Sequence, residues 1–279
     1  MKEVISMWKN TRMIILVALS AAIYAAFLIV FKGGIPIVPG ITEVRPANVF
    51  PVIFSLLFGP AGAWGSAIGN FIGDLFGGTL GIGSIFGFVG NFFLGYIPYK
   101  MWGSVFGLTD GDITQTTNSG NKFSLKKLIA FEIVALTASA ACGIIIAWYL
   151  DLAGIVPFAF LSVTITINNF AAACVLGPIL LVLLYPRVKR WGLIWTDIMK
   201  KEDVSKGMVK SLGTILMIVG SIGGLVVGIL VAAGAAGQAL YGFTGSMGAV
   251  AVWVSVVPFL LVILLASFML SGQEQFVEE

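Results

Sequence analysis

The sequence predicts an all-α integral membrane protein. Of its 279 residues, 58% are hydrophobic and 10% are charged, and the mean hydropathy is +1.03. Soluble domains carry about 25% charged residues. The apolar residues form long runs, and a helix needs roughly 20 residues to cross the hydrocarbon layer of a bilayer. We expect eight spans, at residues 11–31, about 46–60, 61–78, 80–99, 125–149, 157–185, 212–236 and 247–270.

The first six spans differ in length and composition. The first is too long for a cleavable signal peptide, and no small-residue cleavage site follows it. The second and third are short, and an uncharged tight turn at residues 59–62 joins them. In the third and fourth, a small residue recurs every fourth position, which lets helices approach closely. These small residues are Ala61, Gly65, Gly69, Gly73 and Gly77, followed by Gly83, Gly87 and Gly95.

A linker at residues 187–211 separates six spans from the last two. Apolar residues within it keep the spacing of an amphipathic helix, which we expect to lie in the inner interface with its lysines toward anionic headgroups. They are Trp191, Ile194, Trp195, Ile198 and Met199. The seventh span carries a small-residue stripe suited to packing or partner contact. Its members are Gly220, Gly224, Gly228, Ala232 and Ala236. We therefore expect a six-helix membrane domain at 1–186, this linker, and a two-helix membrane extension at 212–279.

Lysine and arginine set the expected orientation. If the N-terminus is cytoplasmic, all basic residues except Lys32 and Arg45 fall in inner segments. Basic residues accumulate in the cytoplasmic loops of membrane proteins. We therefore expect a multi-pass protein of the plasma membrane with both termini cytoplasmic.

The composition argues against several classes of function. The chain has no histidine, the commonest general base and metal ligand, and none of the common hydrolase, P-loop or zinc-binding motifs. Cys142 and Cys174 lie inside apolar stretches, where buried small side chains are expected rather than a disulfide or metal pair. The net charge is only +3, and nucleic acid is not an expected partner. We expect no enzyme activity, no catalytic residues, no cofactor and no metal site.

Polar and aromatic residues in or near the spans are the candidates for a ligand site in the outer half of the bundle. Lipid penalises unpaired polar groups, so their presence needs a reason. The candidates are Glu43, Arg45, Asn48, Asn70, Asp74, Asn91, Trp148, Tyr149, Asn168 and Asn169. Among them, the arginine can hold a carboxylate or a planar amide through its forked donors.

Structural explanations stand beside the functional ones. An ion pair of Arg45 with Asp74 or Glu43 would fix the loop before the second span. The adjacent asparagines of the sixth span can bond to another helix, and the aromatic pair that ends the fifth can belong to the interfacial belt. Glu132 can extend to the inner interface. The first span has no polar residue that we expect to contribute to a cavity.

Two stretches resemble the substrate-binding S component of energy-coupling factor (ECF) importers, and the resemblance covers about residues 8–186. The first stretch is the opening span, TRMIILVALSAAIYAAFLIVF, with an alanine stripe at Ala18, Ala22 and Ala26. The second is EVRPANVFPVIFSLLFGPAGAWGSAIGNFIGDLFGGTLGIGSIFG, similar to the S-component pattern of an outer loop, a short hairpin and a glycine-rich third helix.

Among subfamilies, the chain most resembles the queuosine-precursor type. The resemblance rests on Glu43-Val44-Arg45, on Gly69-Asn70, and on Gly77-Gly78 followed by Phe86-Gly87. The chain departs from that type at two places. Pro46-Ala47 and Gly83-Ser84 stand where the subfamily usually has Ser-Glu and an Asp.

The resemblance implies a six-helix S-component-like bundle that captures a vitamin or related micronutrient, such as a queuosine precursor, at its outer end. Its partners would be the lipid bilayer, an ECF transmembrane coupling subunit and two cytoplasmic ATPase subunits. We expect the alanine stripe of the first span to dock the coupling subunit, because small residues let another helix approach. The alternative is a stand-alone secondary transporter or channel. That would need ionisable groups facing inward, for which the sequence offers little beyond Asp74 and Glu132.

Overall fold

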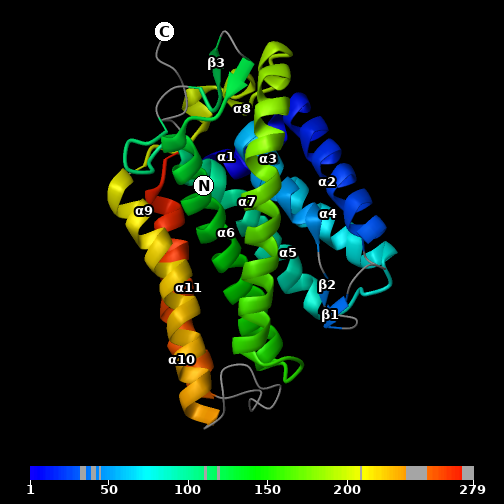
Figure 1. The fold of residues 1–279 in the computed structure, drawn as a ribbon, viewed down its shortest axis with the longest axis vertical. Coiled ribbons are helices and arrows are strands. Elements are labelled where there is room, and N and C mark those ends of the chain that lie inside the picture. The colour runs from blue at the N-terminus through cyan, green and yellow to red at the C-terminus, as the bar shows by residue number, and fades with distance from the viewer. Residues whose placement is uncertain are drawn as a thin grey trace.

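The computed structural model describes residues 1–31, 36–38, 42–43, 45–109, 112–117, 120–207, 209–236 and 250–271. Long helices dominate these residues, with two small antiparallel strand pairs in the connections (Figure 1). The elements are α1 (Lys2–Ser6), η1 (Met7–Lys9), α2 (Thr11–Phe31), β1 (Pro36–Val38), β2 (Thr42–Glu43), η2 (Pro46–Asn48), α3 (Val49–Phe58), α4 (Pro60–Phe76), α5 (Gly83–Trp102), β3 (Gln115–Thr117), β4 (Gly120–Lys122), α6 (Leu125–Leu152), α7 (Phe158–Arg190), α8 (Trp195–Ile198), η3 (Lys201–Asp203), α9 (Lys210–Ile218), η4 (Val219–Gly223), α10 (Gly224–Ala236) and α11 (Val250–Met269).

The all-α membrane fold is confirmed. Within the described ranges, five helical stretches are long and apolar enough to cross a bilayer. They are α2, α6, α7, the run from α9 through α10, and α11. The segment Pro46–Phe58 is apolar but shorter, as the sequence predicts for its second span. Pro60 starts α4 directly after Gly59, whose φ of +54° makes the tight turn that ends α3.

The glycine-rich face of α4 packs against α2. A Cβ atom added at Gly65 would lie 2.4 Å from the Cβ of Ser20, and one added at Gly69 would lie 2.9 Å from the backbone oxygen of Ala21. Gly95 of α5 approaches α4 in the same way, 2.8 Å from the Cα of Ala63. The expected close approach of helices along these small residues is therefore present.

The linker differs from the expected amphipathic helix. α7 continues to Arg190, Gly192 then adopts a φ of +62°, and two short helical turns follow, α8 and η3. Trp195 is fully buried and its ring lies on Gly59, where an added Cβ would come within 2.6 Å. The sequence pattern suggested membrane contact for this tryptophan, but its ring packs inside the protein and fixes the turn between α3 and α4.

The last two spans form a hairpin against α6 and α7 (Figure 1). Gly220 and Gly224 make room for α11, because added Cβ atoms would lie 2.8 Å from Ile263 and Phe259 respectively. Gly228 packs on the ring of Phe158 at the start of α7, at 2.3 Å for an added Cβ. The three glycines of the stripe in the seventh span therefore face neighbouring helices of the same chain.

Candidate functional site

A cavity of about 250 Å³ lies where η2 meets the ends of four α-helices. Its walls come from η2 with the preceding Arg45, the end of α4 with the loop after it, the start of α5, the end of α6 and the start of α7. These ends lie toward the part of the bundle that carries β1 and β2, away from α1 and α8 (Figure 1). The cavity thus sits at the end of the molecule opposite the 187–211 linker.

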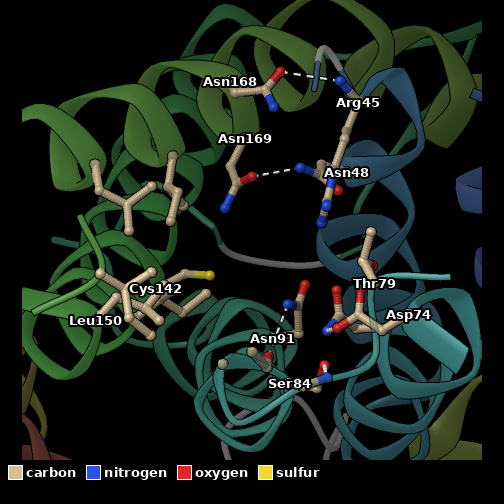
Figure 2. Close-up of a pocket in the computed structure, with 18 of the residues that line it drawn as sticks. Arg45, Asn48, Asp74, Thr79, Ser84, Asn91, Cys142, Leu150, Asn168 and Asn169 are labelled. Carbon is tan, nitrogen blue, oxygen red and sulfur yellow. Dashed lines mark hydrogen bonds between the residues drawn. The ribbon is translucent and has the colours of Figure 1, made fainter. Parts of the chain in front are cut away.

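Seven of the residues singled out from the sequence line this cavity. They are Arg45, Asn48, Asn70, Asp74, Asn91, Asn168 and Asn169. Their backbone positions are spread over more than a hundred residues of sequence, and the helix packing brings them to one place. Figure 2 shows the polar side chains of Arg45, Asn48, Thr79 and Asp74 on one side of the cavity, opposite Cys142 and Leu150.

Three predicted residues are not placed in the cavity wall. Trp148 points toward the C-terminal hairpin, where its Nε1–H donates to the backbone oxygen of Trp253 at 3.4 Å. Tyr149 stacks on Phe86, with 3.4 Å between ring centroids and 11° between planes, and so joins α6 to α5. The side chain of Glu43 lies outside the described residues.

Hydrogen bonds link the asparagines across helices. The Tyr24 hydroxyl lies 2.9 Å from both the Oδ1 of Asn48 and the Oδ1 of Asn91, and it can donate its single proton to one at a time. Asn48 Nδ2 donates to Asn169 Oδ1 (Figure 2). No residue of α2 lines the cavity, as the sequence predicts, but Tyr24 of α2 is 1% exposed and holds two of the lining asparagines through its hydroxyl.

Three further hydrogen bonds hold residues around the cavity. The backbone N–H of Arg45 donates to Asn168 Oδ1 at 3.1 Å, which joins the start of η2 to α7. Asn91 Nδ2 donates to the backbone oxygen of Gly87 at 2.8 Å, while its Oδ1 shares the Tyr24 hydroxyl with Asn48. The loop after α4 is tied down by Thr79, whose hydroxyl donates to Asp74 Oδ1 at 3.2 Å.

The apolar wall was not identified from the sequence. It is made by Cys142, Ile146, Leu150, Ile155, Leu161 and Ile165. Cys142, Ile146 and Leu150 repeat every fourth residue of α6, and Leu161 and Ile165 do so on α7, which places each set on one helical face. That spacing was visible, but in a helix surrounded by apolar neighbours nothing in it separates a cavity wall from ordinary packing.

The donor set suits reversible binding of a small polar molecule. The wall offers five side-chain amides, one carboxylate and one guanidinium, and amides supply donors and acceptors together. Among the described residues, no group of three or more His, Cys, Asp or Glu could hold a metal ion. A small ligand could place polar edges against the asparagines and an apolar face against α6 and α7.

Comparison with known families agrees with this arrangement. Residues 14–186 match the QueT transporter family, and this region contains all the cavity-lining residues. Searches of curated proteins and of solved structures returned no match. The family match covers more than half of the chain, which therefore belongs to the QueT transporter family and is a membrane transport protein.

Proposed function

We propose that this protein is the substrate-capture subunit of an ATP-driven ECF-type importer for a micronutrient. The specific candidate ligand is a queuosine precursor. The observation that carries the proposal is the amide-lined cavity at one end of the bundle, whose lining residues all lie inside the family match. In this proposal, residues 1–186 bind the ligand, 187–211 is the interfacial linker and 212–279 is an added membrane hairpin.

The wall chemistry favours a planar ligand with amide-like edges. Asparagine amides can pair with the donors and acceptors along the edge of a nucleobase. The cavity of about 250 Å³ is smaller than the roughly 300 to 1,000 Å³ typical of drug-sized ligands. A single modified base, with one face against Ile146 and Leu150, fits these limits in size and polarity.

The charge distribution supports an outward-facing cavity. Most lysines and arginines lie at the opposite end, in α1, in the segment before α6, and in the linker after α7. The positive-inside rule then places that end in the cytoplasm and the cavity near the outer surface. This orientation suits capture of a scarce solute from outside the cell.

Binding and uptake test the proposal separately. Purified protein should bind a queuosine precursor base in calorimetry, and Arg45→Ala should weaken binding by about tenfold or more if its side chain contacts the ligand. Arg12→Ala is the matched control, because Arg12 is exposed on α2 outside the cavity. Uptake by cells should require the coupling subunit and the ATPases. Uptake that persists without the ATPases would instead indicate a stand-alone transporter.

A further inference from the structure

Asn70 lines the cavity, and its Oδ1 has no hydrogen-bond partner within the described part of the chain. The residue is 2% exposed, and its Nδ2 donates to Asp74 Oδ2 at 3.4 Å. That bond fixes the amide orientation, since the reversed amide would place its oxygen against the carboxylate. A buried acceptor left unpaired destabilises the folded protein. Packing alone therefore does not account for an asparagine at this position.

The surroundings of Asn70 favour a donor on the ligand. Asp74 lies one helical turn further along α4 and also lines the cavity. Its carboxylate accepts hydrogen bonds from Asn70 and Thr79. The unpaired Oδ1 of Asn70 therefore belongs to the α4 side of the cavity, while the opposite wall of α6 and α7 is mainly apolar.

We propose that Asn70 is a specificity-determining residue whose Oδ1 accepts a hydrogen bond from an N–H group of the ligand. The cavity would then select planar ligands that present an amino-bearing edge to α4 and reject analogues that lack it. A site built to bond a polar group discriminates strongly against its absence, because the site's own atom stays unpaired. This inference rests on the proposed function and narrows its ligand class.

The first test needs no ligand. Asn70→Leu keeps the size of the side chain and removes the unpaired oxygen, so the empty protein should melt at or above the wild-type temperature. Asn91→Leu is the matched comparison, because Asn91 donates to the Gly87 backbone and lies within hydrogen-bond distance of the Tyr24 hydroxyl, so loss of its amide should lower the melting temperature. If Asn70→Leu destabilises as much as Asn91→Leu, the Asn70 amide is structural and the proposal is overturned.

The second test compares two bases, 7-deazaguanine and 7-deazahypoxanthine, which differ by one exocyclic amino group. Wild-type protein should bind the amino-bearing base about tenfold more tightly or better. Asn70→Leu should weaken the binding of 7-deazaguanine more than that of 7-deazahypoxanthine. The affinity ratio of the two bases should fall to about threefold or less. A preference that survives unchanged in Asn70→Leu overturns the assignment of the acceptor to Asn70 while leaving the proposed function intact.

Two other outcomes separate the explanations. If wild-type protein binds neither base, the proposed ligand class fails, and the melting comparison still decides whether Asn70 holds an open acceptor. If sodium chloride, compared with choline chloride, raises the melting temperature of wild type but not of Asn70→Leu, Asn70 Oδ1 binds a sodium ion. That result would overturn the inference.

Discussion

At the residue scale, the Glu3–Lys100 ion pair joins segments that are far apart in the sequence, and neither residue lines the cavity. Lys100 Nζ lies 2.8 Å from Glu3 Oε1, and both side chains are fully buried. The backbone N–H of Ser205 donates to Glu3 Oε2 at 3.0 Å, so the pair joins α1, α5 and the linker. Burial alone would raise the pKa of Glu3, but Lys100 and the terminal ammonium outweigh it and lower the pKa from 4.5 to about 2.

This pair predicts a pH dependence of stability. The folded-state pKa of Glu3 is lower than the unfolded value, so its stabilisation is complete above about pH 4.5 and disappears as the pH falls toward 2. Glu3→Gln leaves Lys100 without a buried partner charge and should cost about 3 to 5 kcal/mol at pH 7. In thermal unfolding, the difference in melting temperature between wild type and Glu3→Gln should become smaller from pH 6 to pH 3.

The control for this experiment is Glu202→Gln. Glu202 pairs with Lys200 at 3.6 Å, but both side chains are about three-quarters exposed, so the change should shift stability very little. If the melting temperatures of wild type and Glu3→Gln differ as much at pH 3 as at pH 6, the lowered pKa of Glu3 is contradicted.

At the same scale, the sequence indicated most of the polar residues that line the cavity, but not the hydrogen bonds between them. The asparagines stand out because amides are rare in apolar helices. Tyr24 does not stand out, because a single tyrosine in an apolar span gives no sign of its partners. Its bonds to Asn48 and Asn91 depend on how α2 meets η2 and α5, which lie further along the chain. Spacing within a single helix carries no information on such pairs.

At the scale of elements, the contact of α4 with α2 predicts a sharp difference between glycines. Gly65→Ala would place a Cβ atom 2.4 Å from Ser20, so the helices must separate at a cost of about 1 to 3 kcal/mol. Gly234→Ala is the matched control, because no atom lies within 4 Å of an added Cβ there, and alanine favours helix over glycine. Urea or thermal unfolding in detergent should show that Gly65→Ala is less stable than wild type and that Gly234→Ala is not. If both variants change the stability by the same amount, helix propensity and not close helix packing decides the effect of replacing glycine.

The helices themselves were predictable because composition and periodicity are local. The expected first span coincides with α2, and the turn at Gly59 divides α3 from α4 as predicted. The linker was not predictable in the same way. Its apolar spacing fits an amphipathic helix, but Trp195 finds its place against Gly59, more than a hundred residues away in sequence. Tertiary packing overrode the local pattern there, and the left-handed Gly192 ended the helix.

At the scale of the whole molecule, the two long faces of the bundle differ. The hairpin of α9, α10 and α11 covers α6 and α7, while α2 lies on the other side of the molecule (Figure 1). On α2, one face is buried against α4, and the alanine stripe at Ala18, Ala22 and Ala26 is exposed. The stripe is therefore not used for packing within the chain, which leaves it available to another helix. We propose this face as the contact for the coupling subunit.

Ala22→Trp tests that proposal, because one bulky side chain in a small-residue stripe blocks the approach of a second helix. Ala22 is exposed and does not line the cavity, so ligand affinity of the purified variant should stay within about twofold of wild type. Co-purification with the coupling subunit and ATP-driven uptake should both be lost. Leu19→Trp is the matched control, since Leu19 is 45% exposed on the same helix but already carries a large side chain. If the complex and its transport survive Ala22→Trp, the docking face lies elsewhere. If ligand binding is lost while the complex persists, the stripe supports the folding of the binding domain instead.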